Sequence, residues 1–392
     1  MHRRSAVAIT VGCIVMLVAL SSLQFASART HGQWTPDAIC SSLDDLAFNG
    51  TRANESVQWQ VSLGPRLPGS NASAMLRDTI TSTLLSAGWH VEEQSHERHG
   101  MVLTNLFARW NGSDADGGQV VMSAHYDSRN IADQDNNVSN RSLPVPGAND
   151  AASGTAVLIE LARWIPSMNL SHDVVLFWND AEDQNDNYTV GAEAWASNLS
   201  ENDINNTHAF VLLDMVGDAD LQLKNINPGN ETLKQRMVTL GEALGLVNGT
   251  EACDGSMGLD VMQYHDEVGV LDDHIHAHRL NIPSIDIMDP EYGDVKFGTF
   301  GTHWHTMEDT PDKVSATSLS QVGRLVEAGL ITGAFVLEGE YTATIDNDPT
   351  NTTNNSNNEA EPLGGNVALA GFAFVSLLTV LALLVIAEWK RH

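Results

Sequence analysis

Two short runs of apolar residues constrain the fold of this chain most strongly. They are VVLFW at 174–178 and FVLL at 210–213. Runs of this length without polar alternation are typical of central strands that are covered on both faces. Further strands are predicted at 102–109, 119–124 and 283–288, and helices at 72–87, 151–165, 233–246 and 314–337. This alternation predicts an α/β fold, a three-layer domain with a central mixed β-sheet flanked by helices.

The two ends of the chain differ from this pattern. Residues 1–28 have a basic start, an apolar run and an Ala-Ser-Ala site, which predicts a secretory signal peptide, with an uncleaved anchor as the alternative. Residues 29–342 form the predicted catalytic domain, and 343–365 a disordered polar stalk. An uncharged segment at 366–387 is long enough to cross a membrane, and a cytoplasmic tail follows at 388–392. That segment is either a permanent anchor or part of a sorting signal that is removed.

The formal net charge is −30. A nucleic-acid backbone would be repelled by such a surface, so we expect no nucleic-acid partner. We interpret most of the acidity as a surface adapted to high ionic strength. The predicted location is the cell membrane, with the catalytic domain outside the cell.

Export also bears on cysteines and glycans. Cys40 and Cys253 are the two cysteines outside the signal segment, and they are either joined in a disulfide or unpaired. Asn-x-Ser/Thr sequons run from Asn49 to Asn354, which agrees with an exported glycoprotein.

Acidic and imidazole side chains follow several of the predicted strands. The candidates are His125 with Asp127, Asp150, Glu182 with Asp183, Asp214, and His305. Functional side chains of open α/β sheets gather at the carboxyl ends of strands. Taken singly, Asp150 reads as a helix N-cap and the acidic pair as a solvated turn. Taken together, they offer the nitrogen and oxygen ligands of a two-zinc hydrolytic site.

The order of these motifs is similar to that of a known family, the co-catalytic zinc aminopeptidases, which also include glutaminyl cyclases and the glutamate carboxypeptidase group. The matching segments extend over about 55–335 and are SLGPRLPGS at 62–70, AHYDS at 124–128, GANDAASG at 147–154, AED at 181–183, LDMVG at 213–217, DH at 273–274, NIP at 281–283 and WHTMED at 304–309.

The resemblance implies a role for each candidate. His125, Asp150 and Asp214 would hold one zinc ion, and Asp150, Asp183 and His305 the other, with Asp150 bridging. Glu182 would take a proton from the attacking water and pass it to the leaving amine. Asp127 would orient His125. Trp304 would contact the substrate.

The chain departs from the family at one of these positions. Asp183 stands where the family usually has glutamate, so the metal spacing or preference is expected to differ. His303 is a rival to His305, and the Trp-His-Thr context favours His305. His274, His276 and His278 are expected beside the site or on the surface rather than as ligands.

We expect a membrane-tethered zinc aminopeptidase that removes N-terminal residues from peptides with a free N-terminus and binds two zinc ions. The first alternative is a glutaminyl-peptide cyclotransferase, which forms N-terminal pyroglutamate with one zinc ion. WHTM at 304–307 and DDHI at 272–275 are similar to that branch. A non-catalytic receptor on the same fold is the lesser alternative, because such a protein would be expected to lose ligands.

Overall fold

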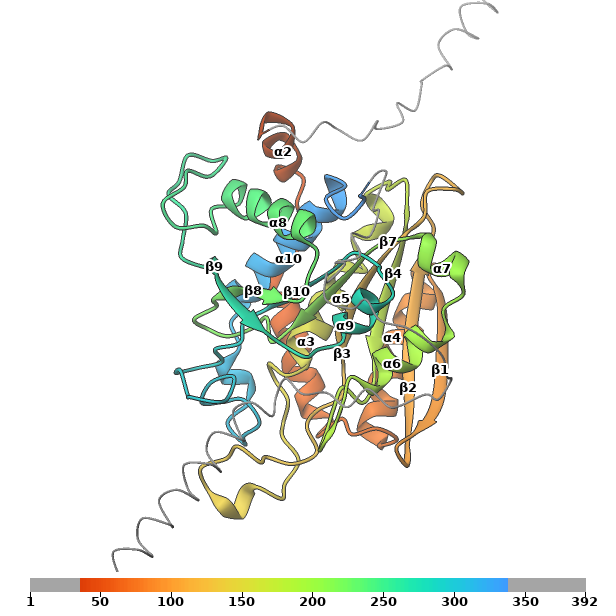
Figure 1. Ribbon diagram of the computed structural model, residues 1–392, viewed down its shortest axis with the longest axis vertical. Helices are drawn as coiled ribbons and strands as arrows, with labels where there is room; N and C mark the ends of the chain where they lie inside the picture. Colours follow the sequence, from red (N-terminus) through yellow and green to blue (C-terminus); the bar gives the residue numbers. More distant parts are fainter. Residues whose placement is uncertain (1–35, 338–392) are drawn as a thin grey trace, which may run out of the picture. The chain divides into compact units, whose positions relative to one another are not determined.

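The computed structural model describes residues 36–337, and its elements can be followed in Figure 1. A six-stranded sheet has the strand order β1-β2-β4-β3-β7-β10. Strands β1, β2 and β4 pair antiparallel, whereas β4, β3, β7 and β10 pair parallel. The central mixed sheet is therefore confirmed. Its strands are β1 (His90–Arg98), β2 (Met101–Trp110), β3 (Gln119–His125), β4 (Asp173–Asn179), β7 (Thr207–Asp214) and β10 (Ser284–Met288).

Helices cover both faces of this sheet. The larger core lies on one face, against the helices α3 (Gly50–Ser62), α4 (Asn71–Ser86), α5 (Ala152–Leu161), α8 (Glu231–Ala243) and α10 (Ala316–Ile331). A second core lies on the other face, against α6 (Val190–Asn198), α7 (Glu201–Asn205) and α9 (His274–Arg279). Helix α2 (Pro36–Leu43) packs against α8. The predicted helical layers on both faces are thus confirmed.

Strand β3 shows how the sequence divides between the two cores. Met122 and Ala124 belong to the larger core, whereas Val121 belongs to the second. Successive side chains of a strand point to opposite faces, so an unbroken apolar run fills both layers. In the second core, Phe177 and Trp195 lie with ring centroids 5.8 Å apart. This packing explains why the central runs show no polar alternation.

Several helices differ in length from the predictions. The helix predicted at 151–165 ends at Leu161, and a 3₁₀ turn, η2 (Ile165–Ser167), holds Pro166, whose ring disfavours helical geometry in the residue before it. The helix predicted at 314–337 begins at Ala316, after the Ser315 cap, and ends at Ile331. The helix predicted at 233–246 begins at Glu231, because Asn230 caps it.

Smaller elements complete the described residues. The two-stranded sheets are β5 (Asp183–Gln184) with β6 (Asn187–Tyr188), and β8 (Leu223–Asn227) with β9 (Met262–Gly269). The other 3₁₀ turns are η1 (Val138–Asn140) and η3 (Pro311–Lys313). The β5–β6 hairpin carries part of the acidic pair into the site described below.

Cys40 on α2 and Cys253 are joined in a disulfide. Within 36–337, no helix combines the length and the apolar character that a membrane crossing needs. The predicted signal peptide at 1–28 and the segments at 343–365, 366–387 and 388–392 lie outside the described residues.

Candidate metal centre at the carboxyl ends of the strands

Three neighbouring strands bring the predicted site residues together. His125 is the last residue of β3 and Asp214 the last of β7. Glu182 lies three residues beyond Asn179, the end of β4, which is paired in register with His125. Because β3, β4 and β7 are parallel, their carboxyl ends meet at one edge of the sheet. The expectation that site residues gather at the carboxyl ends of the strands therefore agrees with the positions of these side chains.

The first ligand triad consists of His125, Asp150 and Asp214. His125 Nε2 lies 3.0 Å from Asp150 Oδ1 and 3.2 Å from Asp214 Oδ1. One ligand atom from each residue lies within 4.8 Å of the others, and all three residues are buried. Burial lowers the pKa of His125, but hydrogen bonds with the surrounding carboxylates raise it well above its ordinary value. The pocket therefore favours a positive charge at this point.

The second ligand triad consists of Asp150, Asp183 and His305. His305 Nε2 lies 2.8 Å from Asp183 Oδ2 and 3.8 Å from Asp150 Oδ2. These ligand atoms also lie within 4.8 Å of one another. Asp150 belongs to both triads, and its two oxygens face different imidazoles. This is the arrangement that a bridging carboxylate needs.

The alternating histidines at 303 and 305 do not lie on a strand. The segment 303–305 is a turn, with His305 at φ 54°. His303 faces the ring of Tyr292, with ring centroids 5.2 Å apart, and belongs to neither triad. Trp304 stacks on His305 at a centroid distance of 3.4 Å, so the aromatic ring forms a wall beside the second triad.

Asp127 connects the two triads. Its carboxylate lies 3.3 Å from His125 Nδ1 and accepts the backbone N–H groups of Glu182 at 3.0 Å and Asp183 at 3.1 Å. Gln184 Nε2 donates a further hydrogen bond at 2.9 Å. Burial raises the pKa of Asp127, but these bonds lower it overall, so the group stays ionised. One carboxylate thus orients His125 and fixes the acidic loop.

Glu182 is the predicted proton carrier. Its side chain is buried, and burial raises its pKa well above the ordinary value. The positive charge of His125 acts in the opposite direction, whereas Asp183 adds to the increase. A carboxyl group with a raised pKa can take up a proton near neutral pH and release it again.

Sequence reasoning missed the residue that holds Asp150. The carboxylate of Asp309 accepts the backbone N–H groups of Ala148, Asn149 and Asp150 at 2.8–3.3 Å. Tyr292 Oη donates to Asp309 Oδ1 at 2.8 Å. Asp309 belongs to the WHTMED motif at 304–309, but the motif does not show which backbone groups its side chain binds.

Arg129 and Asp133 were also missed. Arg129 donates to Asp183, and Asp133 lies 3.3 Å from His305 Nδ1. Both residues lie in the loop that follows β3, where no periodicity predicts the direction of a side chain. The only available signal was their closeness in sequence to His125 and Asp127.

A group of buried acids lies beside the triads. Asp272, Asp273 and Asp286 are each at most 3 % exposed. Burial raises the pKa of Asp273 to about 7, and it raises the pKa values of Asp272 and Asp286 well above the ordinary value. His274 is fully buried, with Nδ1 3.6 Å from Asp286, so the prediction that it is not a ligand agrees with its place outside both triads. The carboxylates around the site outnumber its cations.

Of the other two histidines, His276 lies 2.9 Å from the Thr189 hydroxyl and His278 is exposed.

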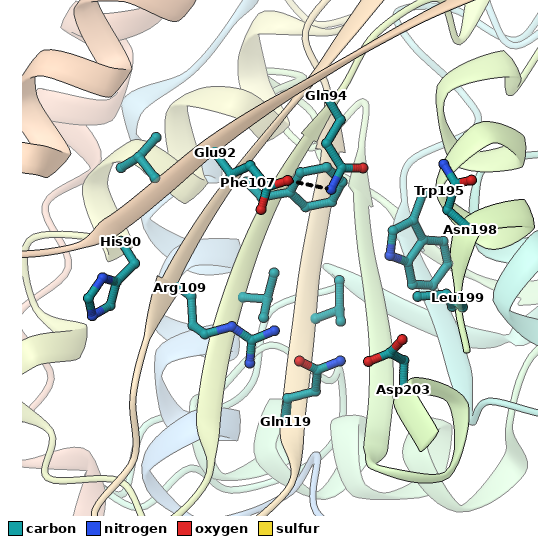
Figure 2. Close-up of a pocket in the computed structure, with 13 residues that line it drawn as sticks. His90, Glu92, Gln94, Phe107, Arg109, Gln119, Trp195, Asn198, Leu199 and Asp203 are labelled. Carbon is teal, nitrogen blue, oxygen red and sulfur yellow. Dashed lines mark hydrogen bonds between the residues drawn. The ribbon is translucent and has the colours of Figure 1, made fainter. Parts of the chain in front are cut away.

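A separate cavity of about 360 Å³ lies between β1, β2 and α6, and its lining includes Arg109, Trp195 and Asp203 (Figure 2). None of its lining residues belongs to a triad.

Known proteins that are similar to this chain include peptidases, in agreement with the two ligand triads. The model of Peptidase family M28 matches residues 105–329, which is more than half of the chain. Aminopeptidase YwaD of Bacillus subtilis is 26 % identical over 218 residues, covering 54 % of this chain and 40 % of YwaD. The chain therefore spans less than half the length of that relative.

Two solved structures match most of the described domain. Glutaminyl cyclase of Porphyromonas gingivalis is 29 % identical with a TM-score of 0.60, covering 71 % of this chain and 96 % of that one. A Zn-dependent exopeptidase of Parabacteroides distasonis is 26 % identical with a TM-score of 0.61, covering 73 % and 99 %. The fold, the ordered motifs and the family match together show that this chain belongs to Peptidase family M28.

Proposed function

We propose that this protein is a zinc-dependent aminopeptidase that hydrolyses the first peptide bond of peptides with a free N-terminus. One observation carries the proposal: two buried triads of imidazole and carboxylate ligands share Asp150. Nitrogen and oxygen ligands of this kind suit zinc. Similarity to a zinc-dependent exopeptidase and to an aminopeptidase supports the choice of metal and of reaction.

The residues present fit two cations. Among the described residues, no well-aligned hydrogen bond satisfies the buried atoms Asp150 Oδ1 and Asp183 Oδ2, which face the imidazole Nε2 atoms of His125 and His305 at 3.0 and 2.8 Å. Buried carboxylate oxygens without a partner are costly, and a cation removes that cost. His125 and His305 each have a carboxylate near Nδ1, which leaves Nε2 for an ion. Zinc bound here would supply Lewis acidity toward water and the scissile carbonyl.

The protein's own groups would then move the proton. Glu182 takes the proton of the attacking water and passes it to the amine that leaves, which its raised pKa allows near neutral pH. Asp127 holds the backbone of Glu182 in place through the 3.0 Å hydrogen bond. Trp304 walls the site beside His305 and would contact the substrate.

Export and tethering are part of the proposal. The sequence of residues 1–28 supports secretion, and the apolar segment 366–387 supports attachment of the catalytic domain to the outer side of the cell membrane. The disulfide between Cys40 and Cys253 agrees with an oxidising compartment. The sequons support glycosylation.

The second candidate is a glutaminyl-peptide cyclotransferase. It is supported by the match to the cyclase of Porphyromonas gingivalis and by Asp273, a fully buried acid that interacts electrostatically with Glu182 and Asp214 but belongs to neither triad. In this reading one zinc ion is bound, and Asp214 is free to act with Glu182 and Asp273 on protons of the substrate.

A substrate panel with metal analysis tests both candidates. The full-length protein, purified with zinc, is incubated with peptides that begin with leucine, alanine or glutamine. Release of the free first residue, abolished by a chelator and restored by zinc, supports the aminopeptidase. Conversion of only the glutamine peptide into a product 17 mass units lighter supports the cyclase. Absence of both reactions in a zinc-loaded, folded protein contradicts an enzymatic function.

A further inference from the structure

The side chain of Asp183 is held by an arginine on one side and faces an imidazole on the other. Arg129 Nη1 donates to Asp183 Oδ1, while Asp183 Oδ2 lies 2.8 Å from His305 Nε2. Arg129 and Asp183 are at most 3 % exposed. Arg129 Nη1 also donates to the backbone carbonyl of Asn185 at 3.0 Å, in the turn of the β5–β6 hairpin. The guanidinium therefore fixes both the side chain of Asp183 and the hairpin that carries it.

The same arginine holds a carboxylate behind His305. Arg129 Nε and Nη2 donate to the two oxygens of Asp133 at 3.1 and 3.2 Å. Asp133 Oδ1 lies 3.3 Å from His305 Nδ1. The four side chains therefore form a closed ring in which each member contacts the next: Arg129, Asp183, His305 and Asp133. A bidentate arginine–carboxylate pair gives such a ring a defined geometry.

In the triad of His125, Asp150 and Asp214, fewer hydrogen bonds orient the ligand side chains. His125 has Asp127 behind its Nδ1, as His305 has Asp133. Within residues 36–337, however, the Asp214 side chain forms a hydrogen bond only with His125. Its orientation is thus set by one contact, whereas that of Asp183 is set by an arginine that is itself anchored twice. The two triads have the same ligand types but differ in how rigidly those ligands are held.

Two effects of Arg129 on a bound cation oppose each other. The guanidinium repels a cation, but its charge is balanced by Asp133 and Asp183, so the three side chains together carry one negative charge. Pre-orientation of ligands by surrounding hydrogen bonds changes metal affinity by about 10- to 100-fold. The two effects predict opposite changes in metal affinity when Arg129 is replaced, so a metal titration of that variant separates them.

We propose that Arg129 and Asp133 are positioning residues that hold Asp183 and His305 in a ligating arrangement, so that the triad of Asp150, Asp183 and His305 binds its ion more tightly than the triad of His125, Asp150 and Asp214. The inference rests on the metal dependence of the proposed function. It accounts for the aspartate at 183: the arginine fixes the shorter side chain against His305.

Cobalt titration tests the inference, because Co²⁺ binding is followed by visible absorption as well as by calorimetry. The full-length, metal-free protein and its Arg129→Met, Asp133→Asn, Asp183→Asn and Asp214→Asn variants are titrated. Arg109→Met, which removes an arginine paired with Asp173 away from the triads, is the matched control. We expect the affinity of the tighter ion to fall about 10- to 100-fold in Arg129→Met and less in Asp133→Asn. Its absorption band should persist in Asp214→Asn and vanish in Asp183→Asn.

The outcomes separate this inference from the proposed function. Unchanged tight binding in both Arg129→Met and Asp133→Asn overturns the positioning role. Loss of the tight ion in Asp214→Asn with its retention in Asp183→Asn overturns the order of the two sites. If the parent protein binds no Co²⁺ or Zn²⁺ at all, the metal-dependent function itself fails. Asp133 is about one-third exposed, and Asp133→Asn removes fewer contacts than Arg129→Met does. If Arg129→Met does not fold, the metal affinity of Asp133→Asn therefore decides whether these residues position the ligands.

Discussion

The carboxylate of Asp127 accepts the backbone N–H of Glu182 at 3.0 Å, although the two residues lie at the ends of different strands. The same carboxylate contacts Nδ1 of His125. One side chain thereby sets the distance between an imidazole ligand and the proposed proton carrier. Asp127, in the loop after β3, and the acidic loop after β4 therefore form one structural unit.

Replacing Asp127 by asparagine should impair both functions of that unit. Asparagine cannot accept with both side-chain atoms, so His125 loses its orienting charge and the acidic loop loses a hydrogen bond. We expect zinc affinity to fall about 10- to 100-fold, with a further loss of kcat. Zinc competition with a chromogenic chelator measures the affinity. Asp186→Asn, an exposed position in the same loop region, is the control and should bind zinc as the parent does.

The support of the bridging ligand can be tested separately. Asp309→Ala removes three backbone hydrogen bonds from the segment 148–150, and we expect loss of both ions together because Asp150 serves both triads. Tyr292→Phe removes only the hydroxyl that donates to Asp309, so its effect should be several-fold smaller. Metal counting after dialysis measures both. Selective loss of one ion in Asp309→Ala would contradict a shared role for Asp150.

The metal-free protein should lose stability as the pH rises from 6.5 to 8. Burial raises the pKa values of Asp180, Asp273 and Asp289 to about 7, whereas an unfolded aspartate titrates near 3.9. In this pH range the native state still holds protons that the unfolded state has released, so the free energy of unfolding falls with pH. His274 and His276, with pKa values lowered by burial to about 4, act in the opposite direction only below about pH 6.5.

Denaturant unfolding of the chelator-treated protein at several pH values measures this dependence. Bound zinc should flatten the curve, because the cations neutralise carboxylates that otherwise need protons. Stability that stays constant or increases between pH 6.5 and 8 without metal would contradict the raised pKa values of these acids.

The disulfide should contribute to the stability of the domain. Cys40 and Cys253 are 213 residues apart, and a crosslink over so long a loop restricts the unfolded chain strongly. We expect Cys253→Ser to lower the free energy of unfolding by about 2–5 kcal/mol. Cys40→Ser removes the same disulfide from its other end and should lower the free energy of unfolding by a similar amount. Stability of either variant equal to that of the parent protein would contradict the expectation.

The acidic surface predicts a response to salt. With 50 acidic against 20 basic side chains, carboxylates repel one another at low ionic strength. Thermal unfolding in 0.1 M and 2 M NaCl should therefore give a higher Tm in the concentrated solution. A Tm that does not rise would leave the acidity unexplained by adaptation to salt.

The sequence predicted a residue's place in the fold where a physical rule relates its position in a strand to its surroundings. Buried strands appear as unbroken apolar runs, and the carboxyl ends of parallel strands must meet, so His125 and Asp214 could be placed. Strand β1 could not be predicted, because it is an edge strand with polar residues on both faces and shows no alternation. Arg129, Asp133 and Asp309 act through contacts between loops, which depend on tertiary structure and leave no periodic trace.

The most direct test of the account is the activity of Glu182→Gln. Glutamine keeps the shape of the side chain but cannot take up a proton, whereas both ligand triads remain intact. We predict that kcat/KM on the best N-terminal peptide substrate falls by about 10²- to 10⁴-fold while the zinc content equals that of the parent protein. Parent-level turnover in this variant, with zinc bound, would contradict the assignment of Glu182 and the mechanism built on it.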